Sequence, residues 1–180
     1  VEEAGERLSE DEQVAMALLL LIAGHETTVN LISSGTLALL QHPEQLAWLR
    51  QHPEGMKTAV EELLRFCSPV DTATERYASE DIELHGTRIQ RGELIIPALS
   101  AANRDPSKFR DPDRPDLRRD PNRHVAFGFG SHYCLGAPLA RMEGQIALNL
   151  LLARFPDLRL SVPADTLRWR ETPVVRGLQA

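Results

Sequence analysis

The chain has 180 residues, of which 42% are hydrophobic, and this is enough to form one domain with a buried core. Its 20 basic and 26 acidic residues give a formal net charge of −6, which argues against nonspecific nucleic-acid binding as the main role. The two cysteines, Cys67 and Cys134, show no disulfide-framework pattern, so a reducing cytoplasm is the expected compartment.

The first predicted element is a long helix over residues 9–40. Ser9 with Glu12 three residues later has the pattern of a capping box, and Pro43 follows the end of the helix. The apolar run 14–23 is about half the roughly 20 residues that a bilayer-spanning helix needs. We therefore expect a helix buried in a core, and no membrane segment.

A polar motif, AGHETT at residues 23–28, interrupts the apolar part of this helix. Glu26 and Thr27 share a broad face with apolar side chains, where a carboxylate costs free energy unless it is paired or functional. The Thr27 hydroxyl is expected to donate to the carbonyl of Ala23 and to loosen the helix beside Gly24. The residues alone leave two interpretations open. One is a polar patch where the helix meets solvent, and the other is a functional pair of an acid and a hydroxyl group.

The middle of the chain predicts two helices and a small sheet. A short helix is expected over 43–52 and another over 53–66, in which Glu62 and Arg65 lie on one face. By themselves these two side chains would form a surface ion pair worth about 0–1 kcal/mol. Cys67 is expected in the core. Strand-like runs at 72–78, 82–84, 88–89 and 94–96, with a turn at His85-Gly86, predict a small antiparallel sheet.

The remainder predicts a loop, a helix and short strands. Residues 109–123 are rich in Pro, Asp and Arg and have no periodicity, which is typical of a folded loop or a linker. A long amphipathic helix ends near Arg154. Strand-like runs follow at 158–162 and 174–175, with a turn near Arg176-Gly177. The expected fold class is mainly α with a small antiparallel β component.

One cysteine lies in a glycine-rich loop, FGFGSHYCLGAPLAR at residues 127–141. Cys134 precedes a helix start marked by Pro138. The free N–H groups and the positive end of that helix favour the thiolate over the thiol. Gly130 and Gly136 allow the backbone to approach something flat and bulky. These residues leave open a structural cysteine, a nucleophile and a ligand for a soft metal.

The motif F-x-x-G-x-x-x-C-x-G, formed by Phe127, Gly130, Cys134 and Gly136, resembles the haem-binding loop of the cytochrome P450 family. The A-G-x-E-T-T motif is similar to the distal oxygen-activation motif of this family. The E-x-x-R pair at 62–65 and the NRDP block at 103–106 also match. The resemblance covers essentially all 180 residues, and implies that residues 1–180 are the C-terminal haem-binding portion of a single P450 domain without its N-terminal portion.

The resemblance also implies roles for the residues. Cys134 is implied to be the axial thiolate ligand of the iron of haem b. Ala23 and Gly24 are implied to leave room over the haem, while Glu26 and Thr27 are implied to deliver protons.

Other positions are implied to support the haem and the substrate. Arg76 and His132 would bind the haem propionates. Arg119 would join the Glu62–Arg65 pair, and residues 70–74 and 173–175 would line the substrate pocket. Pro115 departs from the family pattern, which usually has an aromatic residue there, and this puts the local packing in question.

The implied function is that of a haem-thiolate monooxygenase, which inserts one oxygen atom from O2 into a small apolar organic substrate. The implied electron donor is a ferredoxin or flavodoxin, docking on the Cys134 side where Arg118, Arg119 and Arg123 offer positive charge. Two alternatives remain. In the first, the chain would be a truncated haem-binding remnant without turnover. In the second, it would be a thiol hydrolase that uses Cys134 and His132, although no orienting Asn or Asp is evident.

Overall fold

The structure is a computed structural model that describes residues 2–3 and 6–179 of the chain. It is mainly helical with small antiparallel sheets, which confirms the expected fold class. The helices are α1 (Glu10–Gln41), α2 (Pro43–Gln51), α3 (Met56–Cys67), α4 (Leu99–Ala102) and α5 (Ala137–Arg154), with short 3-10 turns η1 (Pro53–Gly55), η2 (Gly130–His132) and η3 (Ala164–Thr166). The strands are β1 (Glu2–Glu3), β2 (Glu6–Arg7), β3 (Arg76–Tyr77), β4 (Ile82–Leu84), β5 (Thr87–Ile89) and β6 (Leu94–Ile95).

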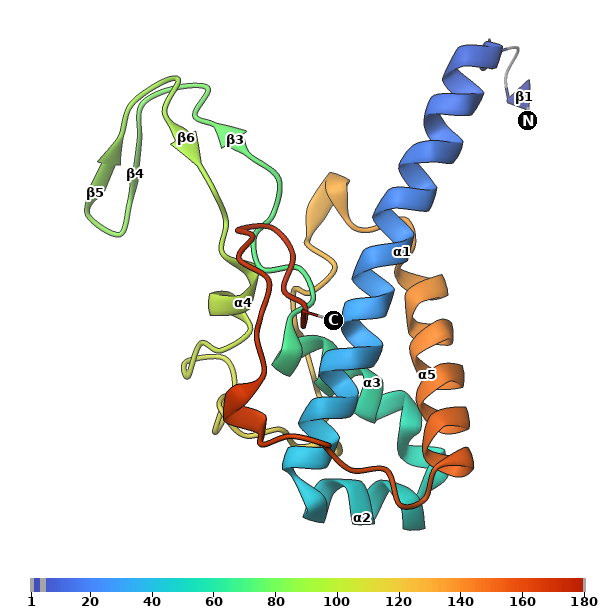
Figure 1. The fold of residues 1–180 in the computed structure, drawn as a ribbon. Coiled ribbons are helices and arrows are strands. Elements are labelled where there is room, and N and C mark those ends of the chain that lie inside the picture. The colour runs from blue at the N-terminus through green and yellow to red at the C-terminus, as the bar shows by residue number, and fades with distance from the viewer. Residues whose placement is uncertain (1, 4–5, 180) are drawn as a thin grey trace.

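The core lies where α3 and α5 pack against the C-terminal half of α1 (Figure 1). Leu31 of α1, Leu63 of α3 and Leu148 of α5 are almost completely buried. Each such side chain stabilises the fold by about 1.5–3 kcal/mol relative to an exposed one. Gly144 brings α5 close to α1, because a Cβ at this position would lie 3.1 Å from Leu31 Cδ2.

The two ends of α1 differ in burial. The capping box is confirmed, because the Ser9 hydroxyl accepts from the N–H of Glu12 and the Glu12 carboxylate accepts from the N–H of Ser9. The expected burial of residues 14–23 is wrong: Leu19 is 60% and Ile22 is 70% exposed. Figure 1 shows the reason, since the N-terminal half of α1 extends beyond α3 and α5.

The apolar stretch of α1 is also longer than the sequence analysis expects. By length and composition alone, α1 qualifies as a candidate membrane span, with a mean hydropathy of 1.5 over its most apolar window. One such helix is weak evidence for a membrane protein, because the core helix of a soluble domain gives the same signal.

The predicted strands at 82–84 and 88–89 are present as β4 and β5, whereas those at 72–78 and 94–96 are shorter than predicted. The run 72–78 forms a strand only at β3, which pairs with β6, and an isolated bridge joins Thr72 to Ala98. The predicted turn at His85-Gly86 is confirmed: it joins β4 to β5, and both residues have positive φ, which matches the twist of a tight hairpin. The run 158–162 is not a strand, because a strand needs a partner and none of the described bridges involves these residues.

The C-terminal segment is a loose hairpin that lies beside α1 (Figure 1). An isolated bridge pairs Trp169 with Leu178, and Val175 bridges to Val70. The turn was expected near Arg176-Gly177 but lies at 172–175, where the Thr172 hydroxyl donates to the carbonyl of Val175 at 2.7 Å. Gly177 instead lies inside the hairpin and packs against Asn30 of α1.

We predict that Gly144→Val lowers the free energy of unfolding by about 1–3 kcal/mol, because the added atoms overpack the contact with Leu31. Ala153→Val is the matched control, since Ala153 is exposed on the same helix and should lose less than about 1 kcal/mol. Urea denaturation followed by circular dichroism measures both, and equal losses would contradict the close helix contact.

Candidate functional site

A buried ion pair on α3 connects the elements of the site. Arg65 Nε and Nη2 donate to the two oxygens of Glu62, both at 2.8 Å, and both side chains are 0% exposed. The same carboxylate accepts from Arg119 Nε at 3.0 Å, Asn122 Nδ2 at 3.0 Å and the N–H of Asp116 at 2.8 Å. The contact with Arg119 is as expected, and the alternative of a surface ion pair is wrong.

The same pair fixes the chain that leads to the cysteine loop. Arg65 Nη1 donates to the carbonyls of Asn103, at 2.8 Å, and Pro112, at 2.9 Å. The Asn103 side chain in turn accepts from the N–H of Val125 at 2.8 Å. Pro115 is buried directly before Asp116, so the missing aromatic residue does not prevent this segment from reaching Glu62. Segment 109–123 is therefore a packed loop and not a linker.

The cysteine loop is shaped by its glycines and by one backbone hydrogen bond. Gly128 and Gly130 have φ values of 73° and 79°, a region that residues with a Cβ rarely adopt. The N–H of Cys134 donates to the carbonyl of Phe127 at 3.0 Å. Helix α5 begins at Ala137 with Pro138 in its first turn, as predicted. Cys134 thus lies exposed just before the positive end of α5.

The two cysteines differ in reactivity. Burial raises the pKa of the Cys67 thiol to about 12, despite the nearby charge of Arg176. Cys67 is therefore a core residue, as expected, and stays a thiol at neutral pH. Cys134 is the cysteine that a ligand or substrate can reach.

The AGHETT motif lies in the middle of α1. The Thr27 hydroxyl donates to the Ala23 carbonyl at 2.7 Å, as predicted, although α1 runs through the motif without a break. Next to it, the Thr28 hydroxyl donates to Glu143 of α5 at 3.1 Å. Through Thr28, the motif therefore contacts the neighbouring helix α5.

Glu26 has a partner that the sequence analysis missed. Arg170 of the C-terminal hairpin forms an ion pair with it, across 144 residues of sequence, and both side chains are 42% exposed. The hairpin is in register for this contact, because the N–H of Arg170 donates to the Gly177 carbonyl at 2.9 Å and Gly177 lies against Asn30, one helical turn after Glu26. No motif marks Arg170 in the sequence.

Arg76 and His132 lie on different elements, β3 and η2. Arg76 Nη1 donates to the carbonyls of Thr74 and Glu75. Within residues 2–3 and 6–179, no carboxylate forms an ion pair with Arg76 and no hydrogen bond of the His132 ring is found. Both side chains retain donors for an anionic group, and their binding of propionates stays a prediction.

The surroundings of Cys134 fit a flat apolar cofactor with acidic edges. Phe129 and Leu135, on either side of Cys134 in the loop, are 91% and 83% exposed. Leu19 and Ile22 of α1 are also exposed. Haem would cover such side chains, take the thiolate as an iron ligand and place its propionates near cationic groups. The residues present therefore fit haem.

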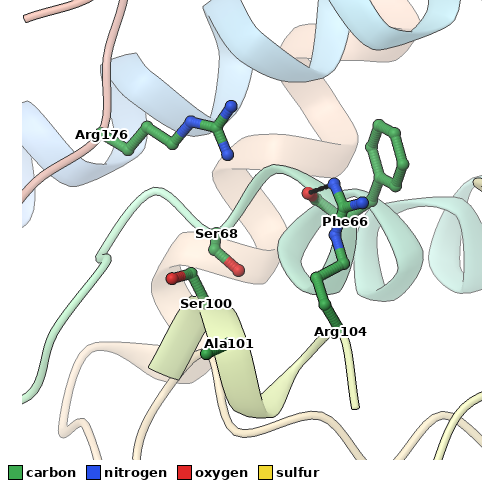
Figure 2. A pocket seen from close by; sticks show the side chains of 6 residues that line it. All are labelled: Phe66, Ser68, Ser100, Ala101, Arg104 and Arg176. Atoms are coloured by element: carbon green, nitrogen blue, oxygen red, sulfur yellow. Dashed lines mark hydrogen bonds between the residues drawn. The ribbon is translucent and has the colours of Figure 1, made fainter. Parts of the chain in front are cut away.

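An open pocket with a volume of about 350 Å³ lies elsewhere, and Figure 2 shows the residues that line it. Its walls are formed by Phe66, Ser68, Ser100, Ala101, Arg104 and Arg176. None of the site residues predicted from the sequence lines it, so we do not assign it to the haem or the substrate.

The structure belongs to a mainly helical class in which one accessible cysteine, Cys134, lies in a glycine-shaped loop directly before a long helix. A family model described as Cytochrome P450 matches residues 49–169, and the chain belongs to the cytochrome P450 family. Members of this family bind haem b through an axial cysteine thiolate.

Known P450 proteins are similar over the whole chain. The polyketide biosynthesis cytochrome P450 PksS of Bacillus subtilis is 52% identical over 179 residues, which are 99% of this chain and 44% of PksS. The solved structure of PksS matches with a TM-score of 0.95 and covers 99% of this chain and 46% of that one. A structure of P450BioI in complex with an acyl carrier protein bearing hexadec-9Z-enoic acid matches with a TM-score of 0.90 at 52% identity, covering 96% of this chain and 44% of that one. The chain thus spans less than half the length of these relatives.

We predict that Arg65→Met destabilises the protein by about 3–5 kcal/mol, because it leaves the Glu62 carboxylate buried without its main partner. Arg88→Met is the control, since it removes the exposed pair with Asp81 and should change stability by less than about 1 kcal/mol. The free energy of unfolding in guanidinium chloride measures both. Similar values for the two variants would contradict the role of the buried pair.

A second carboxylate on α3 predicts a pH effect. Burial by itself would raise the pKa of Glu61, but hydrogen bonds from His124 and Arg141, together with the positive charge of Arg141, outweigh it and lower the pKa from 4.5 to about 2. A carboxyl group whose pKa is lower in the folded state stabilises the fold at pH values above its unfolded-state pKa. This contribution is lost as the pH falls through the folded-state pKa.

We therefore expect the difference in unfolding free energy between the unmodified protein and Glu61→Gln to be constant above about pH 4.5 and to shrink towards pH 2. Denaturant titrations at a series of pH values measure it. Glu80→Gln, at an exposed carboxylate, should show no such trend. A difference that grew on acidification would contradict the assignment.

Proposed function

We propose that this chain is the haem-bearing portion of a haem-thiolate monooxygenase, with Cys134 as the axial ligand of haem b. The observation that carries the proposal is the exposed Cys134 thiol in a glycine-shaped loop at the start of α5, in a chain that belongs to the P450 family. When bound, haem supplies the activation of O2 and the transfer of one oxygen atom to the substrate. The protein residues supply ligation, space and protons.

The cysteine loop holds Cys134, the proposed iron ligand, in place. The Phe127 carbonyl fixes the backbone of Cys134, and Gly136 lies beside the sulfur, where a Cβ would be in van der Waals contact with Sγ at 3.8 Å. When haem is bound, the Cys134 thiolate would be the group that donates electron density to the iron. Phe127, Gly130 and Gly136 serve this geometry.

On the opposite side, the AGHETT motif supplies space and protons. A Cβ at Gly24 would meet no atom of the described chain within 4 Å, so Ala23 and Gly24 would leave room for a bound haem. The Thr27 hydroxyl gives its hydrogen to Ala23, which leaves its oxygen free to accept a second hydrogen bond. Glu26 takes up a proton from water after parting from Arg170, and passes it towards Thr27.

The proposed substrate is a small apolar organic molecule, because Leu19 and Ile22, which precede the AGHETT motif on α1, are exposed apolar side chains. Residues 70–74 and 173–175 would complete the pocket, and their proximity is supported by the bridge between Val70 and Val175. PksS is named for polyketide biosynthesis and P450BioI is seen with an acyl carrier protein. A carrier-bound acyl chain is therefore a second candidate form of the substrate.

The proposed electron donor is a ferredoxin or flavodoxin, which would meet positive charge on the Cys134 side. Arg118 is 62% exposed and Arg123 is exposed, whereas Arg119 is 12% exposed and is engaged with Glu62. Arg119 therefore drops out of the basic surface expected from the sequence. Free cysteines, one buried and one committed to haem, support a cytoplasmic location.

The test uses the full-length protein that contains this chain, loaded with haem, reduced and exposed to carbon monoxide. We expect the absorption band of a thiolate-ligated complex, lost in Cys134→Ala and retained in Cys67→Ala, which removes the buried thiol instead. No such band in any preparation of the unmodified protein would refute haem-thiolate function. A band without product formation in the presence of a redox partner would favour the remnant. Haem-independent hydrolysis that requires Cys134 would favour the thiol hydrolase.

A further inference from the structure

Arg141, on the second turn of α5, is held in a fixed plane by Glu61 of α3. Its Nε donates to Glu61 Oε1 at 2.7 Å and its Nη2 donates to Glu61 Oε2 at 3.0 Å. Two parallel charge-assisted bonds fix both the position and the orientation of a guanidinium group. The side chains are about three-quarters buried, with exposed fractions of 29% and 24%.

The rest of this guanidinium contacts two residues of the cysteine loop that precede Cys134. Arg141 Nη1 donates to the hydroxyl of Tyr133, the residue before Cys134, at 3.1 Å. The carbon centre of the guanidinium lies 4.5 Å from the centre of the Phe127 ring, and Phe127 provides the carbonyl that binds the N–H of Cys134. The Arg141 guanidinium thus contacts both Tyr133, which precedes Cys134, and Phe127, whose carbonyl accepts the hydrogen bond from the N–H of Cys134.

Glu61 also holds the chain that enters the loop. His124 Nδ1 accepts from the N–H of Ala126 at 3.2 Å, so its hydrogen is on Nε2, which donates to Glu61 Oε2 at 3.1 Å. The His124 side chain is nearly completely buried. Glu61 therefore joins the segment before the loop and the helix after it to α3.

The loop needs such anchoring. Between Phe127 and Ala137 it contains only the short turn η2, and two of its glycines have positive φ. The side chains of Phe129, Cys134 and Leu135 are exposed, so core packing does not hold them. Glu62, the neighbour of Glu61 on α3, is engaged with segment 109–123, and among the described residues it forms no hydrogen bond with the loop.

We infer that Glu61 and Arg141 are positioning residues for Cys134, which keep the thiol in the orientation needed to bind the haem iron. The inference rests on the proposed function, in which Cys134 is the ligand. Loss of either side chain frees the guanidinium or the carboxylate and lets the loop turn the sulfur away, while the α1–α3–α5 core remains folded.

The experiment uses the haem-loaded full-length protein as its reduced carbon monoxide complex. Conversion of the thiolate-ligated band to the band of the complex without thiolate is timed at a low guanidinium chloride concentration, and unfolding is followed in parallel by far-ultraviolet circular dichroism. We expect conversion to be about tenfold faster in Glu61→Gln and Arg141→Gln, because a charge-assisted hydrogen bond to the loop anchor is lost. Global unfolding should accelerate by a smaller factor than the band conversion, even in Glu61→Gln, which also lowers the unfolding free energy.

Three further variants sharpen the test. Arg141→Lys keeps the charge without the two parallel bonds, and should fall between the unmodified protein and Arg141→Gln. The double variant Glu61→Gln/Arg141→Gln should convert no faster than the faster single variant, because the two residues act as one unit. Asp113→Asn, which removes the ion pair with Arg104, should convert at the unmodified rate.

Two results would overturn the inference. In one, the Glu61 and Arg141 variants convert no faster than Asp113→Asn. In the other, conversion and global unfolding accelerate by the same factor, which means that the pair only stabilises the whole fold. If Arg141→Gln does not fold, Arg141→Lys decides by the same comparison. A failure of the proposed function is distinct, because the unmodified protein would then show no thiolate band.

Discussion

The charge of Glu62 in the interior of the domain is the constraint on which much of the structure depends. Removing a carboxylate and a guanidinium from water costs several kcal/mol per ion, and their attraction offsets this only when the remaining hydrogen-bonding positions are filled. Arg119, Asn122 and the N–H of Asp116 fill those of Glu62. Arg65 fills its own on Asn103 and Pro112. A segment without helix or strand thereby becomes rigid.

Two neighbouring carboxylates on α3 divide the support of the site. Glu62 fixes segment 109–123, which leads to the cysteine loop. The bond between Asn103 and the N–H of Val125 fixes the chain just before this loop. Glu61 fixes the loop itself and the first turns of α5. Because successive residues of a helix point about 100° apart, one turn of α3 holds both sides of the Cys134 region. The thiol of Cys134 is therefore exposed, while the backbone around it is anchored to the core.

The apolar surface of the chain is as informative as its polar contacts. Leu19 and Ile22 of α1 and Leu135 of the loop are exposed, as are Met142 and Ile146 of α5. Exposed apolar patches of this extent usually mark places where something binds. Haem covers the part beside Cys134 in the function we propose. Through the ion pair between Glu26 and Arg170, the AGHETT motif on α1 also contacts the C-terminal hairpin.

The sequence by itself determined the features that depend on residues a few positions apart. The capping box at Ser9, the Thr27 bond to Ala23, the hairpin turn at Gly86 and the start of α5 at Pro138 are all local, and each was predictable. The motifs around Cys134 also identified the family. Only the tertiary structure decided which partners meet across the chain. Arg170 pairs with Glu26 and Arg141 with Glu61, residues 14–22 are exposed, and 158–162 is not a strand. The physical reason is that burial, ion pairing and strand pairing are set by segments far away in the sequence, which local patterns do not encode.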